Sequence, residues 1–269
     1  MPSVTIDGSA LHYLDQGTGV PVLLGHSYLW DAAMWAPQIE ALARDYRVIV
    51  PDLWGHGGSG PMPADTHTLA DLAGQMDALL QQLEMPPCHV IGLSVGGMWG
   101  AELALRCPQR VRSLVMMDTY VGPEPEAMRL RYFGMLDAIE AAGTIAAPLI
   151  EQVVPIFFRP GFAADWTVAQ GFAKALAEMP VDRLRESVVP LGRMIFGRTD
   201  TRPQLSQLDP AYTLMACGEY DIPRPPKEMQ EMAERVGCAI TQIPDAGHIS
   251  SLENPEFVTQ MLRDWLQRH

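Results

Sequence analysis

The stretch CHVIGLSVGGMWGAELAL, residues 88–105, decides how the rest of the chain is interpreted. Within it, HVIGL is a continuous apolar run of strand length, and MWGAELAL places apolar residues at helical spacing. Ser94 lies between them, with Gly92 and Gly96 on either side, in the pattern Gly-x-Ser-x-Gly. This pattern alone is a weak signal, but a glycine-flanked turn from strand to helix exposes the serine beside a helix amino terminus that favours negative charge. We therefore predict that Ser94 is a nucleophile.

A serine hydroxyl is a poor nucleophile unless a base removes its proton, so a histidine held by a carboxylate should accompany Ser94. His248 is the best candidate because it follows the strand-like run CAITQI, in the loop Asp-Ala-Gly-His. Asp221 is the best candidate for the acid, since it ends the run TLMACGEYD between the serine and the histidine. Glu219 and Asp118 also lie near strand ends and remain alternatives.

The order of strand and then helix repeats on both sides of this stretch. The chain opens with a predicted hairpin, because strand-like alternation at 4–6 and 10–14 flanks the turn Asp7-Gly8-Ser9. Runs that are apolar on both faces then alternate with amphipathic helices, which is typical of a parallel sheet covered on both faces. The predicted strand runs are PVLLGH, RVIVPDL, CHVIGLS, VRSLVMMDTY, YTLMACGEYD and CAITQI.

The alternation stops after Tyr120. From about Val121 to Gln207 the sequence has helical patterns and no convincing buried strand. We predict one α/β domain with an inserted helical cap. Residues 1–121 form the first part of the core, 122–206 the cap, and 207–269 the second part of the core.

The composition excludes several classes of partner. The chain has 269 residues and a formal net charge of -13 at pH 7, which leaves no excess positive charge for phosphate backbones or anionic lipid headgroups. Neither nucleic acid nor a membrane surface is therefore an expected partner. The start lacks a basic and then apolar signal segment, and no run of about 18 apolar residues could span a bilayer. We expect a soluble, cytoplasmic protein.

The four cysteines are scattered singly and in apolar settings. They are Cys88, Cys107, Cys217 and Cys238. No Cys-x-x-Cys pair is present, so we expect buried thiols and no zinc or other metal site.

Several segments resemble the α/β-hydrolase superfamily, in particular its capped bacterial carboxylesterases and enol-lactonases. The matching segments, in the family's order, are VIVPDLWGHGGSG, GLSVGG, GEYDIPRPP and IPDAGHISSLENPEFV. This resemblance implies an α/β-hydrolase fold with a mostly parallel sheet of about eight strands, helices on both faces, no metal and no cofactor. It also implies the order serine, acid, histidine, which favours His248 over His26 and His56, since both precede Ser94.

The resemblance further implies an oxyanion hole made of two backbone N–H groups. One comes from the residue after the nucleophile and the other from the loop after the third strand, and by position these are Val95 and Tyr28. The family usually has His-Gly in that loop, whereas this chain has His26-Ser27. Ser27 is therefore the position where the expected oxyanion loop departs from the family.

The implied reaction is hydrolysis of a carboxylic ester through an acyl-enzyme. Large apolar residues near the expected pocket favour a small-molecule ester of small to medium size and apolar character. The residues expected to line the pocket are Trp30, Trp54, Phe133, Phe157 and Phe158. The cap arginines Arg129, Arg131 and Arg159 offer an alternative, since they could bind a substrate carboxylate.

Other activities fit the same features. A lactonase or enol-lactonase differs only in that the leaving alcohol stays attached to the product. A cofactor-free perhydrolase or a carbon-carbon bond hydrolase would use the same triad with a different oxyanion loop or pocket, which Ser27 leaves open. A ligand receptor on a hydrolase scaffold would bind without turnover. The natural substrate, its stereochemistry and the oligomeric state stay open at this point.

Overall fold

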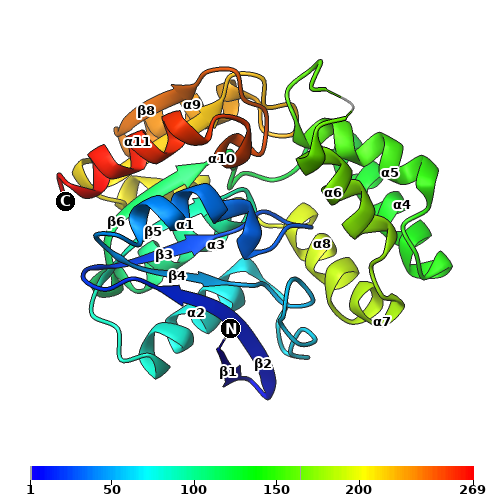
Figure 1. Cartoon of the computed structure of the whole chain (residues 1–269), viewed down its shortest axis with the longest axis horizontal. Coiled ribbons are helices and arrows are strands. Elements are labelled where there is room, and N and C mark those ends of the chain that lie inside the picture. Colours follow the sequence, from blue (N-terminus) through cyan, green and yellow to red (C-terminus); the bar gives the residue numbers. More distant parts are fainter. Residues whose placement is uncertain (1, 164) are drawn as a thin grey trace.

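The computed structural model describes residues 2–163 and 165–269 and is built around an eight-stranded sheet (Figure 1). The strand order is β1-β2-β4-β3-β5-β6-β7-β8. Strands β1 and β2 form the predicted hairpin, and β2 also pairs antiparallel with β4, while all other pairs are parallel. The strands are β1 Ser3–Ile6, β2 Ser9–Gln16, β3 Pro21–Gly25, β4 Arg47–Pro51, β5 Cys88–Leu93, β6 Val111–Met117, β7 Thr213–Gly218 and β8 Ala239–Ile243.

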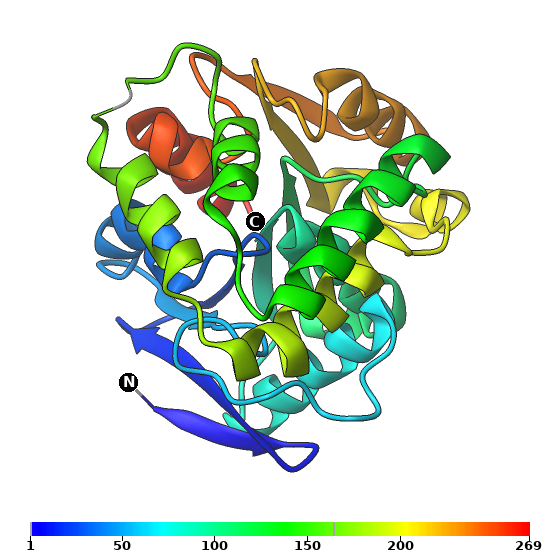
Figure 2. The ribbon, with the colours of Figure 1, turned by 90° about the vertical axis from the view of Figure 1, so that its right-hand side faces the viewer.

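Helices cover both faces of the sheet, which explains why the central strands are apolar throughout. Every residue of β3, β5 and β7 is buried. Helices α1 and α11 pack against each other on one face, and α2 and α3 pack against each other on the opposite face (Figure 2). The core helices are α1 Ala36–Leu42, α2 Leu69–Gln82, α3 Val95–Arg106, α9 Pro226–Val236, α10 Ser250–Glu253 and α11 Pro255–Leu266. The predicted α/β-hydrolase fold is confirmed.

The cap is a group of helices inserted between β6 and β7 and placed at the carboxyl edge of the sheet (Figures 1 and 2). Its helices are α4 Glu126–Ala142, α5 Ala147–Val153, α6 Thr167–Ala177, α7 Val181–Arg183 and α8 Val189–Phe196. A 3-10 turn, η3 Val154–Phe157, follows α5, and a π turn, η4 Leu184–Val188, precedes α8. The described residues of 122–206 contain no strand. We keep 122 and 206 as the proposed boundaries of the cap.

The two ends of the cap meet beside the sheet. The Thr201 N–H donates to the Val121 carbonyl oxygen at 3.1 Å. Glu124, near the start of the cap, accepts a hydrogen bond from Arg198, near its end, at 2.8 Å. Both side chains are almost completely buried, so this ion pair closes the insertion inside the protein. A third side chain, Arg224 from the core, also donates to Glu124.

The cysteines are less uniformly buried than expected. Cys88 and Cys217 lie in the core, but Cys107 and Cys238 are half-buried at the carboxyl ends of α3 and α9. All four are free thiols. In the part of the chain that the structure describes, no helix has the length and apolar character needed to cross a membrane.

Candidate active site

Ser94 occupies a strained turn between β5 and α3. Its backbone angles are φ 57° and ψ -119°, in a region that residues with a side chain rarely adopt. A Cβ atom added at Gly92 would lie 2.1 Å from the Gly96 carbonyl oxygen, and one at Gly96 would lie 2.3 Å from the Gly25 carbonyl oxygen. Both flanking glycines are therefore required by close backbone contacts. The Ser94 N–H donates to the Met117 carbonyl oxygen at 2.9 Å, which ties the turn to β6.

His248 and Asp221 lie on the loops that follow β8 and β7, and they contact each other directly. The His248 Nδ1 atom lies 3.1 and 3.0 Å from the two carboxylate oxygens of Asp221. A carboxylate only accepts hydrogen bonds, so Nδ1 carries the proton and Nε2 is the basic nitrogen. The Arg224 N–H also donates to Asp221, at 2.9 Å, and both members of the pair are buried. The structure thus fixes the tautomer and orientation of the imidazole.

The two alternative acids contact other groups. Asp118 accepts hydrogen bonds from the Gly218 N–H and from the Ser250 hydroxyl. Burial, reinforced by the negative charge of Asp221, holds the pKa of Asp118 well above its usual value, which favours the neutral form of this carboxyl. Glu219 accepts the Asp245 N–H at 3.3 Å. Within the described part of the chain, His248 has a carboxylate partner only in Asp221.

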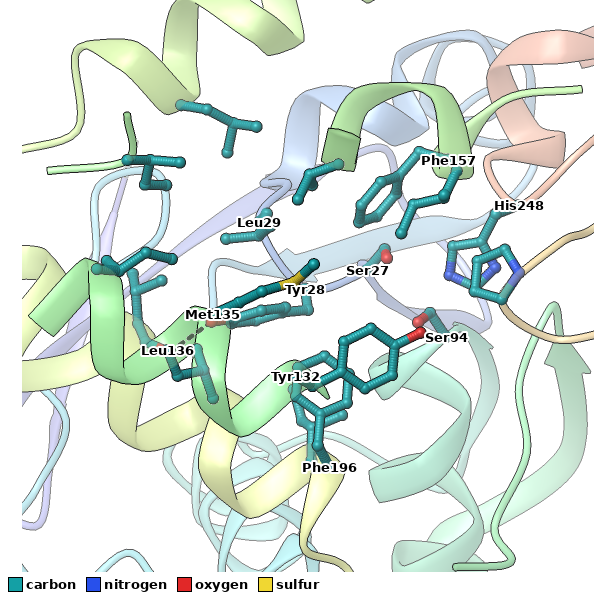
Figure 3. Close-up of a pocket in the computed structure, with 18 of the residues that line it drawn as sticks. Ser27, Tyr28, Leu29, Ser94, Tyr132, Met135, Leu136, Phe157, Phe196 and His248 are labelled. Atoms are coloured by element: carbon teal, nitrogen blue, oxygen red, sulfur yellow. Dashed lines mark hydrogen bonds between the residues drawn. The ribbon is translucent and has the colours of Figure 1, made fainter. Parts of the chain in front are cut away.

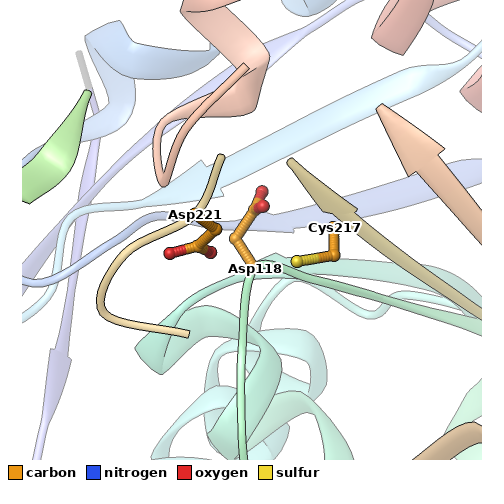
Figure 4. A group of neighbouring side chains, drawn as sticks. All are labelled: Asp118, Cys217 and Asp221. Atoms are coloured by element: carbon orange, nitrogen blue, oxygen red, sulfur yellow. The ribbon is translucent and has the colours of Figure 1, made fainter. Parts of the chain in front are cut away.

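Asp118, Cys217 and Asp221 lie close together at the ends of β6 and β7 (Figure 4). Each residue offers one oxygen or sulfur atom, and these atoms all lie within 4.8 Å of one another. Metal ligands must be deprotonated, whereas burial raises the pKa of both the Asp118 carboxyl and the Cys217 thiol. In addition, Asp221 is already hydrogen-bonded to His248. The protonation of these groups and the bond to His248 therefore argue against a metal at this point.

The two alternative histidines have both ring nitrogens occupied. His26 accepts the Leu53 N–H at Nε2, at 2.8 Å, and its Nδ1 donates to the Ser27 carbonyl oxygen at 2.7 Å. His56 accepts the Leu29 N–H at Nε2, at 3.1 Å, and its Nδ1 donates to the carbonyl oxygen of Trp54. Burial lowers both pKa values, that of His56 to about 3. These neutral rings shape the loop after β3 and are not free to act as bases.

The expected oxyanion loop leaves one N–H group available. The Ser27 N–H donates to the Met34 Sδ atom at 3.2 Å, and the Leu29 N–H is taken by His56. Between them, the Tyr28 N–H has no acceptor among residues 2–163 and 165–269, and the same holds for the Val95 N–H at the start of α3. The positions predicted from the sequence are thus the two N–H groups that a substrate oxygen could use.

A cavity of about 100 Å³ connects these groups with the cap. Ser94, His248, Ser27 and Tyr28 line it from the core side. Figure 3 shows Ser94, Ser27 and His248 at one end, with Leu29, Met135 and Leu136 toward the other. The surface of the cavity is almost entirely apolar. Apolar side chains of the cap supply most of its wall, among them Leu136, Ile139, Ile145, Leu149, Val188 and Ile195.

Of the five predicted pocket residues, Phe157 lines this cavity and the other four do not. Trp54 is fully buried and donates from Nε1 to the Gln75 side chain at 2.7 Å. The Trp30 ring stacks on Phe172, the Phe158 ring packs against Trp166, and the Phe133 ring faces the guanidinium of Arg129. Hydrophobicity predicted that these side chains would be large and apolar, but not the direction in which each points.

Sequence reasoning missed most of the cap residues that do line the cavity. Tyr132, Leu136 and Ile139 lie on one face of α4, at spacings of four and three residues. This spacing is a visible signal for a helix face that turns toward the protein interior. Phe196, which stacks on Tyr132 with ring centroids 4.2 Å apart, carries no comparable signal because it is the last residue of α8.

Two further contacts join the cap to the loops of the site. The Tyr28 hydroxyl donates to the Val188 carbonyl oxygen at 2.7 Å (Figure 3, dashed line). Burial raises the pKa of Tyr28, so this hydroxyl stays protonated. Glu253 accepts the N–H of Arg159 in the cap and the N–H of Gly247 beside His248, both at 2.7 Å. The loop after β3, which is the expected oxyanion loop, and the loop that carries His248 are therefore each attached to the cap.

Proteins with assigned names are similar to this chain along most of its length. A protein from Azorhizobium caulinodans named "Putative carbamate hydrolase RutD" is 37% identical over 266 residues, covering 97% of each chain. The "dihydrolipoyllysine-residue acetyltransferase component of acetoin cleaving system" of Cupriavidus necator is 28% identical, over 97% of this chain and 67% of that protein.

Solved structures show the same fold along nearly the whole chain. A thermophilic esterase from Thermogutta terrifontis superposes with a TM-score of 0.83 at 29% identity, covering 99% of this chain and 96% of the esterase. The enol-lactonase of Burkholderia xenovorans LB400 superposes with a TM-score of 0.84 at 24% identity, which shows likeness of fold alone. The family model described as "alpha/beta hydrolase fold" matches residues 20–255, so this chain belongs to the α/β-hydrolase family.

Proposed function

We propose that this protein is a serine hydrolase that cleaves small to medium apolar carboxylic esters through an acyl-enzyme. One observation carries the proposal. Ser94, on its strained turn, and His248, oriented by Asp221, open onto the same apolar cavity. Membership of the α/β-hydrolase family supports hydrolase activity, and the geometry supports Ser94, His248 and Asp221 as the catalytic triad.

The reaction follows from the positions of these groups. His248 takes the proton of Ser94 at Nε2 while the serine oxygen attacks the ester carbonyl. The N–H groups of Tyr28 and Val95 stabilise the negative charge that develops on the carbonyl oxygen. His248 then protonates the departing alcohol, and a water molecule, activated by the same imidazole, releases the acid from Ser94. Asp221 stabilises the positive charge on the ring in each step.

The lining of the cavity supports an apolar substrate. Most of the wall comes from aliphatic and aromatic side chains of the cap, which favour a hydrocarbon group. Neither Arg129 nor Arg159 lines the cavity, and Arg129 pairs with Glu126 at 2.7 Å. Recognition of a substrate carboxylate by the cap arginines is therefore the weaker alternative.

Hydrolysis of a carbamate is the second candidate function. Relatives named as carbamate hydrolases match most of this chain, and the reaction needs the same attack on a carbonyl group. A lactone would be opened by the same steps, with the alcohol remaining attached to the product. All three reactions use the serine, the imidazole and the two N–H groups, so the substrate panel must include all three.

The experiment combines active-site labelling with turnover. We expect a fluorophosphonate probe to label the native protein at Ser94, and Ser94→Ala to remove both the label and the activity. Ser206→Ala, at an exposed serine of the same chain, should change neither. A panel of p-nitrophenyl esters, lactones and carbamates then ranks the substrates. A native protein that takes no label and turns over none of them would instead be a ligand receptor on this scaffold.

A further inference from the structure

Ser27 carries a buried hydroxyl that nothing in the described protein satisfies. The residue is 0% exposed, and its Oγ atom has no hydrogen-bond partner among residues 2–163 and 165–269. A buried hydroxyl left without a partner costs about 1–3 kcal/mol of stability. An alanine or glycine at this position would avoid that cost, so the hydroxyl requires a functional explanation.

The backbone of Ser27 is held on both sides, which fixes the point from which its side chain leaves the loop. Its N–H donates to Met34 at 3.2 Å. Its carbonyl oxygen accepts two hydrogen bonds, one from the His26 ring at 2.7 Å and one from the Trp30 N–H at 3.2 Å. The side chain therefore leaves the loop from a fixed point, as a group that must meet a developing charge should.

The Ser27 side chain lies beside the cavity that Ser94 and His248 also line. Ser27 lines it together with Ser94 and His248, and Figure 3 shows the three side chains at the same end. The next residue along the chain is Tyr28, whose N–H is available to a substrate oxygen. The Ser27 hydroxyl belongs to the preceding residue and lies at the same end of the cavity as Ser94.

We propose that the Ser27 hydroxyl is a third donor to the oxyanion, beside the N–H groups of Tyr28 and Val95. When the Ser94 oxygen bonds to the carbonyl carbon, the electron pair of the C=O bond moves onto the oxygen, and Ser27 donates its proton in a hydrogen bond without transferring it. The same bond forms again when water attacks the acyl-enzyme. This role rests on the proposed serine hydrolase mechanism and adds a catalytic residue to it.

The test is Ser27→Ala, measured for stability and for rate. We expect kcat for the best p-nitrophenyl ester to fall about 10- to 100-fold, with KM changed less than threefold, because the lost bond forms with the oxyanion. We also expect the melting temperature to stay equal or rise, because the unsatisfied hydroxyl is gone. Acylation and deacylation, measured separately in the burst and the steady state, should both slow by similar factors.

A matched control is Ser113→Ala, at another fully buried serine. Its hydroxyl accepts the Trp265 Nε1–H at 2.9 Å and lies 2.8 Å from the His89 Nδ1 atom, and Ser113 does not line the cavity. This variant should show the reverse pattern, with a lower melting temperature and an unchanged kcat.

Affinity for a boronic acid, whose tetrahedral adduct on Ser94 mimics the oxyanion, should fall in Ser27→Ala by the same factor as kcat.

Three results would overturn the proposal. An unchanged kcat in Ser27→Ala would mean that the hydroxyl has no part in catalysis and is only an unsatisfied buried group. A fall confined to deacylation would make Ser27 a ligand of the attacking water and not of the oxyanion. If a rise in KM accounts for the whole loss of kcat/KM, the Ser27 hydroxyl binds the substrate and does not stabilise the oxyanion. Since each outcome is compared with a native protein that labels at Ser94, it is distinguishable from failure of the serine hydrolase mechanism itself.

Discussion

The carboxyl edge of the sheet and the cap face the same cavity but are built by different means. On the sheet side, Ser94, Asp221 and His248 are fixed one by one, through a strained backbone turn and through hydrogen bonds between buried groups. On the cap side, most of the cavity wall consists of apolar side chains that share one function, although Glu124 also lines it. Ion pairs such as Arg193–Asp137 lie at the outer surface. Chemistry thus depends on single atoms, whereas substrate preference depends on the summed shape of many side chains.

The two regions are joined at a few contacts, and these are where a change in the cap can reach the chemistry. Near the oxyanion loop, Tyr28 donates to Val188 of the π turn η4, and Met62 donates its N–H to the Ser187 hydroxyl at 2.9 Å. Near the histidine loop, Glu253 bridges Arg159 and Gly247.

The largest expected effect comes from a substitution on the sheet side of the cavity that leaves the cap unchanged. Asp221→Asn should lower kcat by about 10³- to 10⁴-fold, because the amide favours the wrong tautomer of His248 and cannot stabilise the imidazolium. Its matched partner is Asp118→Asn, which should keep kcat within a few-fold of the native value, since Asp118 is hydrogen-bonded to Gly218 and Ser250 and not to His248. Steady-state kinetics of the two variants separates the two carboxyls. Full activity in Asp221→Asn would move the acid role to Glu219 or Asp118.

A substitution in the cap should have a smaller effect on kcat, which acts through the proposed oxyanion hole. At Gly192, in α8, an added Cβ would lie 2.6 Å from the Tyr28 hydroxyl oxygen. Gly192→Ala should therefore shift the Tyr28 ring and with it the N–H of the loop, and we expect kcat to fall about tenfold, a fraction of what losing a whole donor costs.

Gly134→Ala is the control for this variant. It lies in α4 of the same cap, where an added Cβ has nothing within 4 Å. Kinetics with a short-chain ester should show native kcat for Gly134→Ala. Equal activity of the two variants would mean that the hydrogen bond between Tyr28 and Val188 does not transmit the position of the cap to the oxyanion loop.

The smallest expected effect concerns stability and pH. Burial raises the pKa of Glu253 to about 7, against the hydrogen bonds from Arg159 and Gly247, and the nearby charges are those of Arg159 and Asp221. The folded protein therefore binds one proton more tightly than the unfolded chain, so the contribution of Glu253 to stability is largest at low pH. It declines as the pH rises from about 4.5, the pKa of an exposed glutamate, to about 7.

Glu253→Gln removes this titration while keeping the shape of the side chain. We expect the melting temperature of the variant relative to the native protein to be higher at pH 8 than at pH 5. Thermal unfolding at both values measures the difference. A difference that is the same at both pH values would show that Glu253 does not titrate in this range.

The sheet side of the cavity was the easier side to predict from the sequence, because its structural requirements are local. Gly92 and Gly96 are needed by close backbone contacts, and a strand followed by a helix pattern places Ser94 at the turn. The availability of the Tyr28 N–H agrees with the position expected from the family's loop. Predicting the cap side was harder, because whether Trp30 or Leu136 reaches the cavity depends on how helices far apart in the chain pack.

The two ends of the cap lie next to each other, and this affects how the cap can be replaced in proteins of this architecture. Thr201 and Val121 share a backbone hydrogen bond, and the buried pair of Glu124 and Arg198 lies just inside it. The insertion thus leaves and re-enters the sheet at almost one point, so another helical segment could replace it without disturbing the order of the strands. Arg224, which donates to both Glu124 and Asp221, is the contact that such a graft would have to preserve. A new substrate range could then be acquired by exchanging one contiguous segment of the gene.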